Sequence, residues 1–256
     1  MAGISACIVV RNEEKFVRRC LENIKGVVDE IVVVDGQSTD STVEICRQYT
    51  DRIFFRKPQG FANPDYQFAI EQATQEWVLV IDADELLSDE ILASLRDLAS
   101  TDVYAAYAFP RRNYYDQAGL KWTSHVAYPD YQVRFSRQDS ILYTGQIHET
   151  PQVKGKTKFL DDKYYMIHLV PGSYEFKDFK SHYIRFAKIQ ARQEGLSRSR
   201  PMYFLKAFSD FVWTLNENLI RKKGYKDGAA GLCATFMFAS YNFLVSWYKA
   251  TGQSAK

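Results

Sequence analysis

The sequence predicts an α/β protein built around a mostly parallel central sheet. Three observations predict this fold: short apolar runs typical of buried strands, helical patterns that alternate with them over the first hundred residues, and acidic residues directly after several of the runs. This alternation is typical of a parallel sheet with right-handed crossover connections. Sheets of this kind bind ligands at the carboxyl ends of their strands, so we expect the functional site at that edge.

Each element of the predicted sheet is justified by its local pattern. The run 4–10 is apolar and β-branched, and 14–26 carries apolar residues at helical spacing. A loop with Pro58 and Gly60 separates a short strand from the next helix. We expect strands at 4–10, 30–34, 52–55 and 77–81, and helices at 14–26, 41–49, 65–73 and from Ser88 onward.

The pattern changes in the second half of the chain. Aromatic-rich strands with interspersed turn residues predict an irregular antiparallel extension of the same sheet over 104–165. Beyond Tyr174 the chain is predicted to be helical, with large apolar residues three or four apart on one face. These residues are Phe204, Phe208, Phe211, Leu215 and Leu219. We find no repeat or flexible linker and predict two closely joined regions, residues 1–172 and residues 173–256.

Composition and charge exclude some classes of function. The 256 residues include 33 basic and 31 acidic side chains, and this net charge of +2 argues against a nucleic-acid-binding protein. Cys7, Cys20, Cys46 and Cys233 lie among apolar neighbours without metal-ligand spacing, which predicts reduced thiols in the core. The apolar run 4–10 is too short for a signal peptide, so we expect a cytoplasmic protein.

Asp82, Asp84 and Glu85 directly follow the apolar run 77–81. Grouped carboxylates raise one another's pKa, and a hard divalent cation that holds a diphosphate removes this repulsion. The pattern therefore predicts a metal and nucleotide site for Mg²⁺ or Mn²⁺. The alternative is that the acids cap the helix that begins at Ser88.

Two other predicted strand ends also carry acids. Asp35 precedes Gly36, which permits close approach of a ligand, and its carboxylate can accept a hydrogen bond from a nucleobase. Glu13 follows Arg11 and Asn12 at the end of the first strand, where an acidic residue can hold ribose hydroxyls. We assign Arg11, Asn12, Glu13, Asp35 and Asp82 to nucleotide binding.

Three blocks of sequence resemble the signatures of family 2 glycosyltransferases with the GT-A fold, a Rossmann-like sheet with flanking helices. The blocks are 9–14, 34–40 and 82–85. The resemblance implies that Asp35 meets the nucleobase and that Glu13 lies near the ribose of a nucleotide sugar. It also implies that Asp82 and Asp84 hold Mg²⁺ or Mn²⁺ on the diphosphate.

Further blocks resemble small bacterial enzymes related to lipopolysaccharide inner-core glucosyltransferases. They are 133–135, 143–149, 167–168 and 224–228. The loop 64–67, which often carries Arg-Asn in these relatives, has a different sequence here. We assign Arg134 to a nucleotide phosphate, with a surface arginine as the alternative. His168 is assigned to the metal, with a core histidine as the alternative.

Glycosyl transfer with inversion needs a base that takes the proton of the acceptor hydroxyl. Glu149 is the predicted base, and the adjoining His148 orients it or serves in its place. The alternative for Glu149 is an ion pair or a loop cap.

The segment 228–248 contains no charged residue and follows the basic run Arg221, Lys222 and Lys223. Three interpretations are open: a helix that lies in the membrane plane or docks to it, a buried core helix, and a membrane span.

Together these features predict an inverting, metal-dependent glycosyltransferase. We expect it to move a hexose from a nucleotide sugar, UDP-glucose or similar, to a membrane-associated glycolipid such as the lipopolysaccharide core. Residues 1–172 would form the GT-A domain, and residues 173–256 would dock the acceptor and the inner face of the cell membrane. The alternatives are a polyprenyl-phosphate glycosyltransferase and a non-catalytic nucleotide-binding module that docks to membranes.

Overall fold

The computed structural model describes residues 2–58, 62–114, 124–126, 128–147, 149–169 and 183–252. The chain forms two compact units. The sheet unit comprises Met1–Arg112 and Asp130–Leu169, and the helical unit comprises Asn113–Pro129 and Val170–Lys256.

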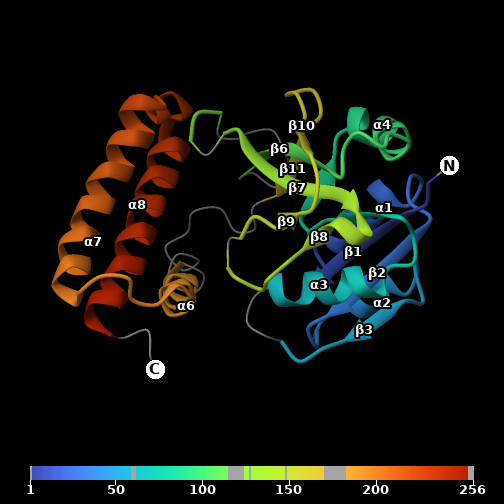
Figure 1. Cartoon of the computed structure of the whole chain (residues 1–256), viewed down its shortest axis with the longest axis horizontal. Helices are drawn as coiled ribbons and strands as arrows, with labels where there is room; N and C mark the ends of the chain where they lie inside the picture. Colours follow the sequence, from blue (N-terminus) through green and yellow to red (C-terminus); the bar gives the residue numbers. More distant parts are fainter. Residues whose placement is uncertain are drawn as a thin grey trace. The chain divides into compact units, whose positions relative to one another are not determined.

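The sheet unit is built on a nine-stranded sheet within the described residues (Figure 1). Its strands are β1 (Ile4–Val10), β2 (Glu30–Asp35), β3 (Ile53–Phe55), β4 (Trp77–Val80), β5 (Glu85–Leu87), β6 (Ala106–Tyr114), β7 (Asp130–Arg137), β10 (Thr157–Phe159) and β11 (Met166–Leu169). The strand order is β3-β2-β1-β4-β7-β6-β11-β5, with β10 paired to β6. Because β1 is parallel to β2 and β4, and β2 is parallel to β3, the predicted parallel core is confirmed.

The second half of the sheet is mainly antiparallel. β7 is antiparallel to β4 and β6, and β11 is antiparallel to β5, which confirms the predicted extension. One pairing differs from the prediction, because β10 is parallel to β6. The chain reaches β10 through the small antiparallel pair β8 (Ile141–Leu142) and β9 (Gln152–Val153), which reverses its direction before it meets β6.

Helices cover both faces of the parallel part of the sheet. They are α1 (Val17–Ile24), α2 (Thr42–Cys46), α3 (Asn63–Gln72) and α4 (Asp89–Ala99). Ile8 and Leu79 belong to the core cluster that includes α1, α2 and α4, whereas Cys7 and Val80 pack with α3. Because strand side chains alternate between the two faces, both sets must be apolar, and the strands read as continuous apolar runs.

Several helix ends differ slightly from the predicted bounds. α1 begins at Val17 because the preceding residues form a turn, in which the Phe16 N–H donates to the Glu13 carbonyl. Ser88 caps α4, since its hydroxyl accepts a hydrogen bond from the Ile91 N–H at 3.4 Å. Ser88, rather than the acids at 82–85, therefore caps this helix.

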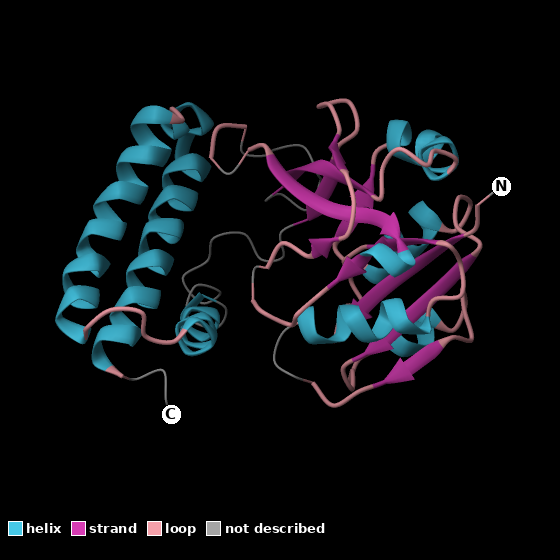
Figure 2. Cartoon of the chain, viewed as in Figure 1, coloured by secondary structure: helices cyan, strands magenta, loops and turns pink. Residues whose placement is uncertain are grey.

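The described part of the helical unit contains α6 (Ile184–Glu194), α7 (Arg200–Leu215) and α8 (Gly228–Thr251). α7 and α8 lie side by side as a hairpin (Figure 2). A π-helical turn, Asn216–Arg221, and a 3₁₀ turn, Gly224–Asp227, connect them. α8 passes close to the second turn at Gly231, where an added Cβ would overlap the Gly224 carbonyl oxygen.

One side of the α7–α8 hairpin carries an aromatic face, in which neighbouring ring centroids lie 5.3 to 6.3 Å apart. It consists of Phe204, Phe208, Phe211, Phe236, Phe243 and Trp247. Phe204, Phe208 and Phe236 are 44%, 52% and 60% exposed. The apolar stripe predicted on α7 is therefore real, but much of it faces outward.

Two sequence predictions concern α8. Within the described residues one helix, Gly224–Thr251, is long and apolar enough to cross a membrane, and 33% of its most apolar window is buried. Since a core helix of a soluble protein can pass the same test, the three interpretations of this segment stay open. The four cysteines are free thiols, but Cys233 on α8 is exposed, which corrects the prediction that it lies in the core.

Candidate active site

The carboxyl ends of β1 and β2 lie next to each other because the strands are parallel, with Val10 opposite Asp35. Hydrogen bonds join the loops that follow. Asn12, at φ 57°, accepts from the Thr39 N–H at 2.8 Å, and its own N–H donates to Ser38 Oγ at 2.9 Å. The structure thus brings together four predicted nucleotide-binding residues, Arg11, Asn12, Glu13 and Asp35.

Asp35 is fixed at the end of β2. It is 1% exposed, and its carboxylate accepts hydrogen bonds from the Ser38 N–H at 2.9 Å and the Ser38 hydroxyl at 2.5 Å. The neighbouring Gly36 lies against Arg11, whose side chain would be 3.4 Å from an added Cβ. Asp35 therefore closes the turn after β2, and its contact with a nucleobase stays a prediction.

Glu13 lies where acidic groups from separate segments gather. Burial raises the pKa of Glu13 to about 8, with smaller contributions from the charges of Asp84, Asp82 and Asp40. β4 is the other parallel neighbour of β1, so the loop that carries Asp82 and Asp84 starts beside the loop that carries Glu13. The acids at these strand ends therefore share one electrostatic environment.

The two aspartates after β4 have different partners. The Asp82 carboxylate accepts hydrogen bonds from the Tyr66 hydroxyl and, at 2.5 Å, from the Arg134 guanidinium. Burial raises the pKa of Asp82; Arg134 opposes this shift, and neighbouring carboxylates add to it. Asp84 Oδ2 lies 3.3 Å from His168 Nε2, and the two side chains are 18% and 20% exposed. The structure thus pairs Asp84 with His168, whereas Asp82 faces Tyr66 and Arg134.

A buried network of charges holds Arg134. Glu85 is fully buried and pairs with Arg134 at 2.8 Å and with Arg111 at 2.9 Å, and Arg111 also pairs with Asp130 at 2.7 Å. Burial alone would raise the pKa of Glu85, but Arg134 and Arg111 outweigh it and lower the pKa to about 2. Arg134 is 5% exposed, so the surface-arginine alternative is wrong, while its contact with a phosphate stays a prediction.

Sequence reasoning missed two members of this site, Tyr66 and Arg111, and it grouped Glu85 with the acids after β4 without its buried pairing. All three contact Asp82 or Arg134 directly or through one shared carboxylate. Arg111 gave the clearest signal, because it follows an apolar run within β6, where an unpaired charge would be costly. Tyr66 gave none beyond its place in a helix that packs on the sheet.

The residues near β4 fit a divalent cation that also binds a diphosphate. Mg²⁺ and similar ions commonly take one or two protein ligands, with substrate phosphates and water as the rest. Asp84 offers a carboxylate oxygen and His168 an imidazole nitrogen, and these two possible metal ligands lie 3.3 Å apart. Among the described residues no three His, Cys, Asp or Glu side chains converge as a metal site. The Asp84–His168 pair therefore fits a cation that takes its remaining ligands from substrate phosphates and water.

Glu149 closes a turn near the start of α3. Its carboxylate accepts hydrogen bonds from the Thr144 N–H at 2.9 Å, the Thr144 hydroxyl at 2.6 Å and the Gly145 N–H at 2.8 Å. Gly145, at φ 80°, lies against Pro64, whose Cα would be 3.6 Å from an added Cβ. Glu149 thus acts as a loop cap here, and its role as a base stays a prediction. His148 lies outside the described residues.

This turn and the acids after β4 meet at α3. The Tyr66 and Tyr143 rings lie 5.2 Å apart, and the Tyr143 N–H donates to the Gln67 side chain at 3.0 Å. Tyr66 also donates to Asp82. The helix whose first turn departs from the pattern of the inner-core glucosyltransferases therefore connects the two halves of the site.

Some known proteins resemble nearly the whole chain, and others resemble only part of it. The lipopolysaccharide core biosynthesis glycosyltransferase LpsC of Rhizobium meliloti is 27% identical over 252 residues, which cover 95% of this chain and 90% of LpsC. Several other curated relatives align over less than half of their own length, for example an uncharacterized Rickettsia felis glycosyltransferase at 36% identity, with 42% of this chain and 38% of that protein covered.

Among solved structures, Staphylococcus aureus TarS 1–349 aligns over 99% of this chain and 92% of its own, with 14% identity and a TM-score of 0.48. The family model described as Glycosyl transferase family 2 matches residues 5–162, more than half of the chain. The chain is therefore a glycosyltransferase that belongs to family 2 and has the predicted GT-A arrangement of a central sheet with flanking helices.

Proposed function

We propose that the protein is an inverting, metal-dependent glycosyltransferase that moves a hexose from a UDP-sugar to a membrane-associated glycolipid such as the lipopolysaccharide core. The main support is that the carboxyl ends of three adjacent parallel strands, β2, β1 and β4, each lead into acidic residues. Ligands of parallel α/β sheets bind at this edge. The similarity to LpsC over nearly the whole chain supports the lipopolysaccharide core as acceptor.

In this proposal the donor lies across the ends of β2 and β1. Asp35, held by Ser38, accepts a hydrogen bond from the nucleobase, and Glu13 accepts from the ribose hydroxyls. Arg11 and Asn12 flank the ribose and the base. The Asp35 carboxylate is already fixed by the Ser38 N–H and hydroxyl, so little reorganisation of this residue accompanies binding.

The diphosphate lies at the end of β4. Asp84 and His168, together with Asp82, would hold Mg²⁺ or Mn²⁺, which would offset the charge that develops on the departing nucleoside diphosphate. Tyr66 and Arg134 orient the Asp82 carboxylate. Arg134 would also supply positive charge to the phosphates.

Glu149 is the proposed base. Three donors from Thr144 and Gly145 fix its carboxylate in one orientation, so the side chain is held in place for an incoming acceptor. His148 orients Glu149 or takes its place. The acceptor hydroxyl would lose its proton to this side chain as it attacks the sugar.

The helical region 173–256 is proposed to dock the membrane that carries the acceptor. Two features support this: the partly exposed aromatic face of α7 and α8, and the exposed basic residues Arg221, Lys222 and Lys223 between those helices. Aromatic rings enter the lipid interface, and basic residues bind anionic headgroups. The protein would then be peripheral at the inner face of the cell membrane, with residues 1–172 as the catalytic domain.

The metal site can be tested with Asp84→Asn. Calorimetric titration of UDP with and without Mn²⁺ should show metal-dependent binding in the wild type and its loss in the variant. Hydrolysis or transfer of the UDP-sugar should fall roughly 10²- to 10³-fold, as expected when several kcal/mol of charge stabilisation is removed.

Two variants sharpen the result. Asp139→Asn, at an exposed acid outside the site, should retain UDP binding and activity. Glu149→Gln should lose transfer while its UDP affinity stays that of the wild type, because it alters the proposed base and leaves the donor ligands in place. UDP binding that is indifferent to EDTA, or full activity of Asp84→Asn, would refute the proposal.

A further inference from the structure

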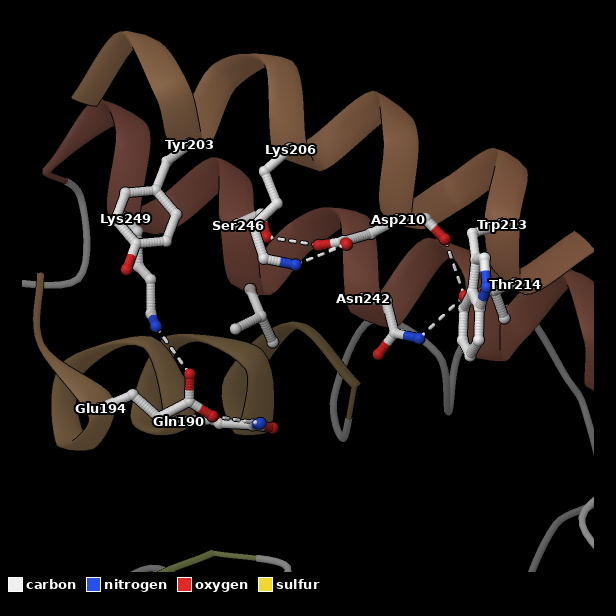
Figure 3. Close-up of a pocket in the computed structure, with 11 residues that line it drawn as sticks. Gln190, Glu194, Tyr203, Lys206, Asp210, Trp213, Thr214, Asn242, Ser246 and Lys249 are labelled. Atoms are coloured by element: carbon white, nitrogen blue, oxygen red, sulfur yellow. Dashed lines mark hydrogen bonds and ion pairs between the residues drawn. The ribbon is translucent and has the colours of Figure 1, made fainter. Parts of the chain in front are cut away.

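The helical unit contains a polar pocket of about 280 Å³ between α6, α7 and α8 (Figure 3). This volume lies just below the ~300–1,000 Å³ range of small-molecule sites, so it suits a small compound rather than a whole nucleotide sugar. Its lining includes Gln190 and Glu194 of α6, Lys206 and Asp210 of α7, and Asn242 and Lys249 of α8. None of these residues belongs to the candidate active site.

The charges that line the pocket balance one another. Lys206 Nζ lies 2.5 Å from Asp210 Oδ1, and Lys249 Nζ lies 2.6 Å from Glu194 Oε2. Ser246 also donates to Asp210, at 2.7 Å. Because each lysine is already paired with a carboxylate, the pocket offers little net attraction to a phosphate or another anion.

Packing alone gives no reason for these polar side chains. Lys249 is 7% exposed, and the desolvation of its ammonium group offsets much of what its ion pair with the 44%-exposed Glu194 contributes to stability. Large apolar side chains are available on the same helices, yet Phe208 and Val212 of α7 are 52% and 63% exposed. A hairpin selected only for stability would place them inside. The arrangement favours a polar ligand.

The lining combines hydrogen-bonding groups with aromatic rings. Asn242 donates to Thr214 Oγ1 at 2.9 Å, which fixes its amide at the pocket wall. Trp213 also lines the pocket and is 61% exposed, so its ring is accessible to a ligand. A sugar ring has hydroxyl groups at its edge and C–H groups on its faces. Fixed amides and carboxylates match the hydroxyls, and an indole ring matches the C–H face.

We propose that this pocket binds a neutral saccharide unit of the glycan acceptor. The assignment of the saccharide to the acceptor rests on the proposed function. The site holds the glycan through Trp213, Asn242 and the two ion pairs, and it is formed by the helical unit alone. It gives α6, α7 and α8 a role in acceptor recognition in addition to membrane docking.

Saturation-transfer NMR on the full chain tests the pocket. The probes are the methyl glycosides of glucose, galactose, mannose and N-acetylglucosamine, with UDP and Mg²⁺ in the same sample. At least one glycoside should receive saturation from the wild type, and its signal should fall at least fivefold in Trp213→Ala and in Asn242→Ala. The signal should stay unchanged in Tyr225→Ala, which removes an exposed aromatic ring of the same unit that does not line the pocket.

The UDP signal separates the two proposals. If UDP receives saturation in every variant but no glycoside does, the pocket inference is wrong while the donor site stands. The inference is also overturned if the glycoside signal persists in both pocket variants, or if inorganic phosphate displaces the glycoside. Loss of the UDP signal in the wild type, with glycoside binding retained, would instead refute the proposed donor site.

Discussion

The two units of this protein differ in where they place their large apolar side chains. In the sheet unit the largest buried side chains are aromatic and aliphatic, and Trp77, Tyr107, Phe109 and Phe135 are at most 1% exposed. In the helical unit, buried positions of the α7–α8 hairpin include Thr214, Thr235, Ser246 and Lys249, while several phenylalanines lie outside.

This difference indicates how each unit is stabilised. The sheet unit buries its apolar surface within itself, as expected of a domain that folds in water. The helical unit leaves large apolar side chains exposed to water, and hydrogen bonds and ion pairs join its helices in addition to a small apolar cluster between α6 and α8. A lipid interface around the aromatic face and a saccharide in the polar pocket would each supply a missing partner.

Replacement of matched tryptophans provides the strongest test of this comparison. Trp77→Ala should lower the free energy of unfolding by about 3–5 kcal/mol, because Trp77 is fully buried and stacks on Phe135 at 4.8 Å. Trp213→Ala should change it by no more than about 0.5 kcal/mol, since that ring is 61% exposed. Urea unfolding followed by circular dichroism measures both. If both variants lost the same free energy of unfolding, the contrast between the two units would be wrong.

Acid should weaken a polar link of the helical unit. The Asp227 carboxylate accepts hydrogen bonds from the His125 ring at 2.9 Å and from the His125 and Val126 N–H groups at 2.9 and 3.1 Å. Burial alone would raise the pKa of Asp227, but these hydrogen bonds outweigh it and lower the pKa below 3.8. The stabilisation is therefore present at neutral pH and is lost as the pH falls through the lowered pKa.

Asp227→Asn should cost about 1.5–3 kcal/mol at neutral pH, the usual loss for hydrogen bonds to a charged group. The difference from wild type should stay constant above about pH 5 and shrink as the pH is lowered towards 3. Thermal unfolding across this range, with Asp139→Asn as a control, measures the effect. A difference that grows on acidification would rule out this account of Asp227.

The smallest expected effect concerns the aromatic face. Phe208→Ser should weaken binding to anionic phospholipid vesicles about tenfold, because one phenyl group contributes roughly 1.5 kcal/mol or more when it leaves water. Phe159→Ser is the matched control, since Phe159 is 60% exposed but lies on β10 of the sheet unit. Vesicle sedimentation should show normal binding for the control. Equal binding of both variants, or a dimer that forms through Phe208 without vesicles, would argue against a lipid contact.

The parallel part of the sheet was predictable from sequence because its pattern is local. Each strand carries apolar residues on both faces, and each acidic group follows its strand directly. The β1, β2 and β4 ends could therefore be placed at one edge from chain order alone. The pairing of β10 with β6 depends on a reversal elsewhere in the chain and left no local signal.

The contacts inside the site were less predictable because they join distant segments. Arg134 pairs with Asp82 across 52 positions of sequence, and nothing local distinguishes it from a surface arginine. In the sequence Glu85 looks like one more acid of the group after β4, and it differs from Asp84 only in being fully buried in the structure. On α8, Thr235 and Ser246 are polar residues in a mostly apolar segment, and nothing local in the sequence shows that they are buried.

The exposed thiol of Cys233 gives the protein a built-in attachment point. Burial raises the pKa of Cys7, Cys20 and Cys46 and suppresses their thiolates, whereas Cys233 lies open on α8. A maleimide dye should consequently modify one position of the native chain without any engineering. Its emission colour would then report directly whether this stretch of α8 sits in water or among acyl chains.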